Sequence, residues 1–318
     1  MPTLDLTVDL TGTTNPVYFP LYECDSPYLI LYGGGGSGKS VFAAQKILAR
    51  IIEEQDHSFL VVRKIQRTVK DSVFALFRKL IRQYGLTPLA KIVESPVPRI
   101  TFPLFRSEII FTGLDDEEKV KSITSTITDT LTGVWVEEPT ELTQDDFEQL
   151  TIRLRGETKH YQQITLSFNP IHEMHWLKKH WFDTVRPDAT ILKTTYKHNR
   201  FLTATDRQRL EDLKKTNERK YRVYCLGEWG SYGDLVFEAH HWCVERIKLT
   251  RDDYDRVYYG IDFGFNDPSC ILCVGVKDSE IFVVSEFYAS GLINQELIRE
   301  AQAIIPAGAA VTCDSAEP

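Results

Sequence analysis

Short apolar runs alternate along the first half of the chain with longer segments in which apolar residues recur every three or four positions. Runs of β-branched, aliphatic and aromatic residues predict buried strands, and the longer spacing predicts amphipathic helices. The predicted strands are 28–32, 59–62, 131–137, 163–168 and 191–195. The predicted helices between them are 39–54, 68–84, 144–155 and 172–182. Such alternation is typical of a three-layer α/β domain with a mostly parallel sheet, here with an inserted hairpin pair at 99–102 and 108–111.

The pattern changes after a polar, helical segment at 202–227, which ends in a glycine-rich break at 227–233. Three strands, a helix and a further strand are predicted beyond it, at 257–262, 269–276, 280–288, 294–305 and 310–314. Three antiparallel strands followed by a helix and a strand form the opening half of a ribonuclease-H-like order. We therefore expect a first domain over 1–228, a linker region over 229–255 and the N-terminal part of a second domain over 256–318.

Composition narrows the class of protein. The 318 residues are 42% hydrophobic and 26% charged, which supports sizeable cores and excludes a disordered chain. The net charge of −8 argues against broad, sequence-independent binding of nucleic acid, although it leaves room for a local basic channel. Apolar stretches stay shorter than the ~18 residues of a membrane span, no secretion signal is visible, and six scattered cysteines fit a reducing interior.

A glycine-rich loop lies between the first predicted strand and the first predicted helix, and it matches the pattern G-x-x-x-x-G-K-[ST] in full. Its residues are Gly33, Gly34, Gly35, Gly36, Ser37, Gly38, Lys39 and Ser40. Glycines allow backbone N–H groups to wrap around phosphates where side chains would collide. Lys39 is expected to reach the β- and γ-phosphates of a nucleotide and Ser40 to bind Mg²⁺.

Two acids, Glu137 and Glu138, end the apolar strand at 131–137. In an ATPase the first would support Mg²⁺ through its water shell, and the second would orient the attacking water. The alternative is a solvated strand end. Two acids favour ATP hydrolysis over a GTP switch, and no Asn-Lys-x-Asp element for reading guanine occurs in the sequence. Asn169, after the next strand, is a candidate γ-phosphate sensor or, alternatively, part of an Asn-Pro turn.

These motifs, taken in order, resemble the large terminase subunit of tailed bacteriophages over essentially the whole chain. Beyond the phosphate loop and the segment 133–138, the resemblance rests on short motifs at 153–155, 167–170, 194–199, 227–230, 260–264 and 313–318. It implies an ASCE-type phosphate-loop ATPase domain followed by a ribonuclease-H-like nuclease domain. It also implies that Lys39 and Ser40 bind phosphate and Mg²⁺, that Glu138 is the hydrolytic acid, and that 167–169 couple hydrolysis to motion. One departure is Gly35, where many relatives carry an arginine.

The resemblance further implies that ATP hydrolysis drives double-stranded viral DNA into a procapsid. The expected partners are DNA, a portal protein and a small terminase subunit, with the chain in a ring oligomer on the procapsid and no membrane contact. The expected location is the cytoplasm of the infected bacterial cell. Two alternatives stay open: another DNA-dependent phosphate-loop ATPase of helicase type, and a nucleotide-gated assembly protein with little hydrolysis.

Carboxylates at the strand ends of the second domain predict a two-metal nuclease site. Asp262 and Asp314 each end an apolar strand and could together hold two ions, or could merely end their strands. With the family resemblance both are expected to be metal ligands, with Asp267 and then Glu286 as weaker candidates. Ligation by acids alone suits Mg²⁺ or Mn²⁺. Since a third carboxylate of the family lies beyond Pro318, we expect a truncated chain with an incomplete nuclease site.

Overall fold

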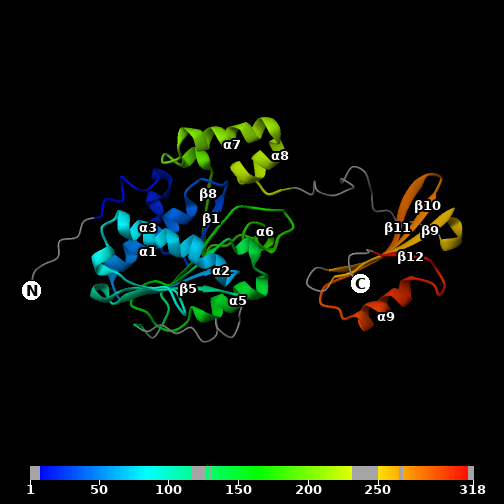
Figure 1. Cartoon of the computed structure of the whole chain (residues 1–318), viewed down its shortest axis with the longest axis horizontal. Helices are drawn as coiled ribbons and strands as arrows, with labels where there is room; N and C mark the ends of the chain where they lie inside the picture. The colour runs from blue at the N-terminus through cyan, green and yellow to red at the C-terminus, as the bar shows by residue number, and fades with distance from the viewer. Residues whose placement is uncertain (1–7, 116–126, 129, 231–249, 265–267, 314–318) are drawn as a thin grey trace, which may run out of the picture. The chain divides into compact units, whose positions relative to one another are not determined.

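The computed structural model describes residues 8–115, 127–128, 130–230, 250–264 and 268–313. The chain divides into two compact units, residues 1–238 and 239–318 (Figure 1). Most of the expected linker region, 229–255, lies outside the described residues. Within the described ranges, no helix has the length and apolar character needed to cross a membrane.

The first unit is built on an eight-stranded sheet with the strand order β3-β4-β5-β2-β6-β7-β1-β8. Its strands are β1 (Tyr28–Gly33), β2 (Ser58–Arg63), β3 (Lys91–Val93), β4 (Arg99–Phe102), β5 (Ser107–Gly113), β6 (Gly133–Glu137), β7 (Gln163–Phe168) and β8 (Ala189–Thr194). All pairings from β5 to β8 are parallel, and only β3–β4 and β4–β5 are antiparallel. The predicted, mostly parallel α/β sheet is therefore confirmed.

The order of the central strands defines the class of sheet. The strand that leads into the phosphate loop, β1, does not pair with β6, which carries the two acids. Instead β7 lies between them and pairs in parallel with both. An additional strand therefore separates the phosphate-loop strand from the acidic strand.

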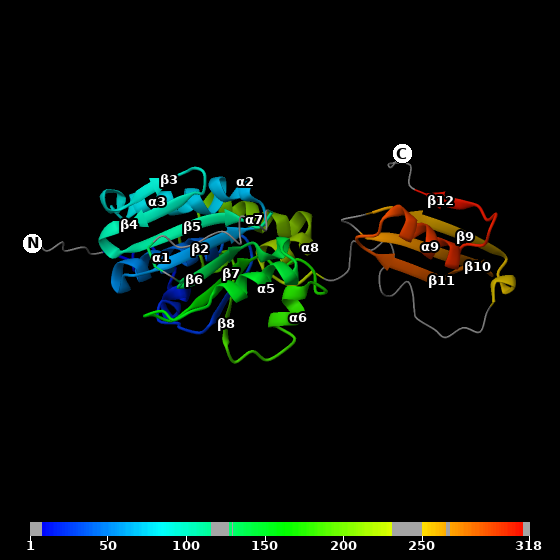
Figure 2. The ribbon, with the colours of Figure 1, turned by 90° about the horizontal axis from the view of Figure 1, so that it is seen from below.

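Helices cover both faces of this sheet because the side chains of each strand alternate between them. The helices are α1 (Lys39–Glu54), α2 (Gln66–Val69), α3 (Ala75–Gln83), α5 (Gln144–Arg153) and α6 (Trp176–Trp181). Leu29 and Leu31 pack with α1 and α3 in one core cluster, whereas Ile30 packs with α5 and α6 in another. The helices α3 and α5 accordingly lie on opposite sides of the sheet (Figure 2).

Three local predictions differ from the structure. The hairpin predicted at 99–102 and 108–111 is confirmed as the antiparallel pair β4–β5. It is not an insertion, however, because β5 also pairs in parallel with β2 and is buried along its whole length, so it belongs to the main sheet. The helix predicted at 68–84 is interrupted by a wider π-type turn at Lys70–Phe74. The helix predicted from His172 begins only at Trp176, because His175 is its N-cap and accepts a hydrogen bond from the Leu177 N–H.

A small helical segment follows the sheet. It contains α7 (Ala204–Thr216), α8 (Glu218–Lys220) and a wide helical turn at Tyr221–Cys225. No residue of α7 is buried, so the segment is held chiefly by a small cluster of Tyr196, Tyr221 and Cys225. Its end returns to the phosphate loop, as described below.

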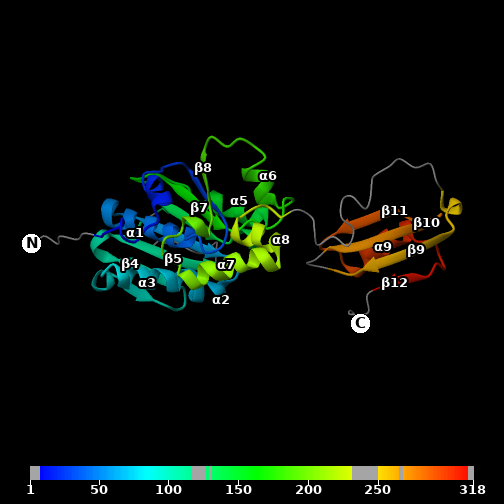
Figure 3. The same cartoon turned by 90° about the horizontal axis from the view of Figure 1, so that it is seen from above.

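The second unit is a four-stranded sheet with the order β11-β10-β9-β12. Its elements are β9 (Arg256–Asp262), β10 (Ser269–Lys277), β11 (Glu280–Ala289), α9 (Asn294–Ile304) and β12 (Val311–Cys313). The first three strands are antiparallel, and β12 pairs in parallel with β9. The helix α9 covers one face, in front of the sheet in Figure 2 and behind it in Figure 3. This smaller sheet fits part of a ribonuclease-H-like domain, as predicted.

Candidate nucleotide-binding site

The phosphate loop connects the carboxyl end of β1 to the first turn of α1. Gly36 and Gly38 adopt φ angles of 70° and 90°, in the left-handed region that favours glycine. Gly38 caps α1, so the partial positive charge of the helix N-terminus faces the loop. A phosphate bound there would meet both backbone N–H groups and this helix end.

Lys39 lies folded against the loop, and its Nζ, with three N–H donors, lies within hydrogen-bonding distance of four oxygen atoms. The acceptors are Gly33 O at 3.1 Å, Gly34 O at 2.8 Å, Ser37 Oγ at 3.2 Å and Asn169 Oδ1 at 2.8 Å. Burial lowers the pKa of Lys39 to about 8, although Glu138 and Glu137 oppose this by attraction. A buried cation beside two carboxylates is well suited to bind an anionic phosphate.

Glu137 joins the phosphate loop to the neighbouring strand. Ser40 Oγ donates to Glu137 Oε1 at 2.7 Å, and Ser167 Oγ of β7 donates to Glu137 Oε2. Ser167 is itself oriented by Trp135, whose Nε1 donates to Ser167 Oγ at 2.7 Å. Burial raises the pKa of Glu137. The hydroxyl of Ser40 and the carboxylate of Glu137 form an oxygen-donor set of the kind that Mg²⁺ prefers, so these residues fit that ion.

Glu138 follows in an unusual backbone conformation, with φ 53° and ψ 57°. Its N–H donates to Ser167 O at 2.9 Å, so the chain turns at the carboxyl end of β6, next to Glu137. Burial, and then repulsion by Glu137, raise the pKa of Glu138 to about 7, while Lys39 and Arg63 oppose the rise. A carboxyl group with a pKa near neutrality can accept a proton from water.

Several residues that hold the loop were not assigned from the sequence. Tyr18 Oη donates to Ser37 O at 3.1 Å, and Asn199 Nδ2 donates to Gly36 O at 2.7 Å. Asn15 Nδ2 in turn donates to Asn199 Oδ1 at 3.2 Å. Of these three residues, only Asn199 lies in a motif that the sequence analysis used, because it ends the segment 194–199 of the family resemblance. The N-terminal segment and the motif after β8 therefore brace the loop from outside.

The first loop glycines are closely packed against the end of β8 and the chain that follows α8. The N–H of Gly34 donates to Thr194 O at 2.9 Å and that of Gly35 donates to Tyr224 O at 2.6 Å. A Cβ added to Gly34 would lie 1.9 Å from Cys225 O, and one added to Gly227 would lie 2.2 Å from Gly33 Cα. These positions therefore accept only glycine without movement of the backbone.

The second unit contains only part of the predicted metal site within the described residues. Asp262 is the last residue of β9 and pairs with Cys270 of β10, while Glu286 of β11 pairs with Leu272. Burial raises the pKa of Cys270, and Glu286 and Asp262 add to the rise, which places both carboxylates near this thiol. Asp267 and Asp314 lie outside the described residues.

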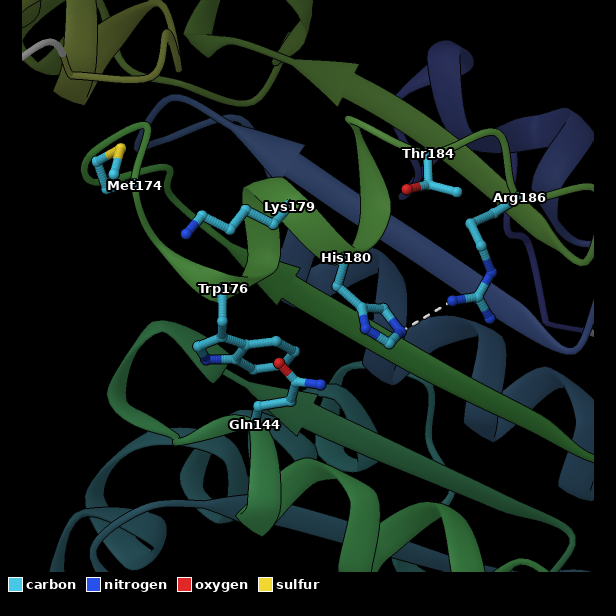
Figure 4. A pocket seen from close by; sticks show the side chains of 7 residues that line it. All are labelled: Gln144, Met174, Trp176, Lys179, His180, Thr184 and Arg186. Carbon is cyan, nitrogen blue, oxygen red and sulfur yellow. Dashed lines mark hydrogen bonds between the residues drawn. The ribbon is translucent and has the colours of Figure 1, made fainter.

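A surface hollow of about 480 Å³ lies elsewhere, beside α6 (Figure 4). Its lining includes Trp176, Lys179 and His180, and Arg186 donates toward His180 Nε2 at 2.8 Å. None of its lining residues belongs to the phosphate loop or the acidic pair. The hollow is therefore separate from the candidate nucleotide site.

The sheet order and the loop geometry define a phosphate-loop nucleotide-binding protein with an additional central strand. A family model described as phage terminase large subunit matches residues 26–228. The chain belongs to this family. It is 28% identical to the PBSX phage terminase large subunit of Bacillus subtilis (strain 168), over 94% of this chain and 72% of that protein. It is 30% identical to the large terminase subunit of Bacillus phage SPP1 over 75% of this chain, but spans only 58% of that protein.

Solved structures share the fold. The large terminase of a thermophilic bacteriophage is 18% identical, with a TM-score of 0.55 over 95% of this chain and 74% of that one. The same protein in complex with ADP gives a TM-score of 0.56 at 16% identity, over 97% and 78% of the two chains. The HK97 bacteriophage large terminase gives 0.53 at 15% identity, over 98% and 71%.

Proposed function

We propose that this chain is the ATPase of a phage DNA-packaging motor, which hydrolyses ATP to move double-stranded DNA into a procapsid. The observation that carries this proposal is the chain of contacts from Ser40 through Glu137 to Ser167, with Lys39 and Glu138 beside it. Family membership and the ADP complex of the thermophilic bacteriophage's large terminase support the choice of nucleotide.

Each residue of the site has a distinct role in this proposal. Lys39 exchanges its oxygen partners in the loop for the β- and γ-phosphates, and the loop N–H groups bind the same phosphates. Ser40 and Glu137 would hold Mg²⁺, which when bound neutralises the charge that develops on the phosphates. Glu138 orients the attacking water and accepts its proton.

Asn169 connects the site to the rest of the sheet. Its Oδ1 accepts from Lys39 Nζ at 2.8 Å, and it directly follows β7, whose Ser167 binds Glu137. Loss of the γ-phosphate would change the contacts of Lys39 and thereby those of Asn169. We infer that 167–169 transmit the state of the nucleotide to the remainder of the chain.

The second unit is proposed to contribute to a nuclease that cuts concatemeric DNA with two Mg²⁺ or Mn²⁺ ions. Asp262 and Glu286 lie on strands that flank β10, which supports a shared acidic site. Asp267 and Asp314 are proposed as further ligands. A portal protein and a small terminase subunit are the proposed protein partners, in a ring assembly on the procapsid.

The decisive experiment compares steady-state ATP turnover in the native chain and in Glu138→Gln, with double-stranded DNA present. We expect turnover to fall about 100-fold or more, because the amide cannot accept the proton of water, while nucleotide binding persists. The matched control is Glu148→Gln, an exposed acid on α5 that accepts a hydrogen bond from Gln144. Unchanged turnover in Glu138→Gln would remove this residue from its role.

The same assay separates the two other functions left open by the sequence. Stimulation by single-stranded DNA, together with strand separation, would indicate a helicase-like enzyme. Negligible turnover by the native chain with every DNA, despite tight ATP binding, would indicate a nucleotide-gated assembly protein.

A further inference from the structure

A second cluster of polar side chains lies at the amino-terminal ends of the parallel strands, whereas the phosphate loop lies at their carboxyl ends. Glu54 is the last residue of α1, His57 immediately precedes β2, and His160 lies in the segment before β7. One ligand-type atom from each of these three residues lies within 4.8 Å of the other two. Glu54 Oε2 is 2.8 Å from His57 Nε2 and 3.8 Å from His160 Nδ1.

We propose that Glu54, His57 and His160 form a binding site for one transition-metal ion, with Zn²⁺ as the ion that these ligands favour. Two imidazoles and one carboxylate are a common set of protein ligands for zinc, with water in the fourth position. Imidazole ligands also disfavour Mg²⁺ and Ca²⁺, which prefer oxygen atoms alone. The site shares no residue with the proposed ATPase site, and the inference does not rest on that function.

His57 is buried and held in a position that suits coordination through Nε2. Its Nδ1 lies 3.0 Å from Thr132 Oγ1, which accepts from the Ser58 N–H and lies 3.2 Å from Ser58 O. If Nε2 binds a metal, Nδ1–H can donate to Thr132, whose own proton then goes to Ser58 O. The His57 ring and the Thr132 hydroxyl would then both keep their hydrogen bonds, and such support from the second ring nitrogen is usual for metal-binding histidines.

Glu54 is supported in the same way. Arg50 Nε donates to Glu54 Oε2 at 3.1 Å, while Arg50 Nη2 donates to Tyr161 O at 2.9 Å. The guanidinium also stacks on the Tyr161 ring, 3.7 Å from its centroid, so it is fixed independently of the carboxylate. A carboxylate has lone pairs enough to accept from arginine and bind a metal, and ligating carboxylates are commonly hydrogen-bonded by another residue.

His160 provides the least satisfied group of the cluster. Its ring lies 4.6 Å from that of His57, centroid to centroid. Its Nε2 is buried and makes no hydrogen bond to any residue that the structure describes. A buried nitrogen without a partner costs free energy, and coordination of a metal through Nε2 would give this nitrogen a partner. A metal bound here would tie the end of α1 to the chain entering β2 and β7.

The test measures zinc bound by the full chain in a large excess of Mg²⁺, which occupies sites made only of oxygen ligands. We compare the native chain with His160→Gln and Glu54→Gln, whose side chains are only partly buried. The matched control is His172→Gln. His172 is exposed, and its ring lies near that of His175, so this variant also removes one histidine of a neighbouring pair.

We expect one zinc per native chain after dialysis, and a Tm raised by about 5–10 °C at zinc concentrations near 100 times Kd. His172→Gln should retain both effects, whereas His160→Gln and Glu54→Gln should bind at least about 100-fold more weakly. Retention of zinc and of the Tm shift in His160→Gln would overturn the proposal, as would the absence of zinc from the native chain. If a variant does not fold, the native chain is loaded with Co²⁺ and its visible absorption spectrum tests the site instead. Bands typical of four-coordinate Co²⁺ would support the proposal, and a six-coordinate spectrum would refute it.

Discussion

Replacing Glu138 by Gln is expected to make the protein more stable while ATP turnover falls about 100-fold or more. The ionised carboxylate is disfavoured in the folded state, because burial and the neighbouring Glu137 raise its pKa from the ordinary 4.5 to about 7. Below pH 4.5 the group is protonated in both folded and unfolded chains and has no effect. Between pH 4.5 and 7 the unfolded chain loses the proton first, so stability falls, and above pH 7 the full loss is present.

The magnitude follows from the size of this pKa change. Each unit of pKa corresponds to about 1.36 kcal/mol, so a rise from 4.5 to about 7 makes ionised Glu138 unfavourable by roughly 3 kcal/mol. Because the side chain is still partly exposed, solvent screening reduces the effect to about 2 kcal/mol. A neutral amide of nearly the same shape avoids this loss. In a domain of this size, about 2 kcal/mol corresponds to a rise in Tm of about 4–8 °C.

Thermal unfolding without nucleotide measures the effect at pH 8 and at pH 5. The Tm of Glu138→Gln should exceed that of the native chain at pH 8, and most of the difference should disappear at pH 5. Glu148→Gln, in an exposed part of α5, should change Tm by no more than about 1–2 °C at either pH. An equal or lower Tm for Glu138→Gln at pH 8 would show that the carboxylate is not destabilised in the folded chain.

Two further predictions concern the same site. Lys39 has a pKa of about 8 without nucleotide, and phosphate oxygens will raise it, so ATP binding at pH 8.5 should take up a fraction of a proton. Calorimetry in two buffers with different ionisation enthalpies measures this uptake, and identical binding enthalpies would contradict it. Ser167→Ala should lower the free energy of unfolding by about 1–3 kcal/mol, because the Trp135 N–H loses its acceptor. Denaturant unfolding tests this, with Ser72→Ala as the control, because the partly exposed Ser72 hydroxyl donates only to Thr68 O of its own helical segment. A loss no larger than that of the control would refute the prediction.

In the candidate nucleotide site, the sequence predicts those residues that belong to short local motifs or to the ends of predicted strands. The glycine loop is recognisable because every position of its motif is adjacent in the chain. The contact between Ser40 and Glu137 crosses 97 residues, yet it could be anticipated, because the carboxyl ends of parallel strands meet at one edge. The same reasoning places Asn169 beside Lys39.

Other features depend on tertiary packing that no local pattern encodes. An aromatic residue such as Tyr18 reads as core, and nothing near it indicates that its hydroxyl binds Ser37 O. The left-handed turn at Glu138 is hidden inside what reads as a strand end followed by proline. The antiparallel pairing of β4 with β5 joins neighbouring segments and could be predicted, whereas the parallel pairing of β5 with β2 joins distant segments and has no local signal.

The close packing of the phosphate loop affects how mutational data on this protein should be interpreted. Gly227 lies far along the chain from the loop, but any side chain there would overlap Gly33, and its φ of 61° already favours glycine. A comprehensive substitution scan would therefore score Gly227 as intolerant as Lys39. Such a score would reflect the absence of space between two backbones and no contact with a nucleotide, so intolerance at this position would not mark Gly227 as part of the chemistry.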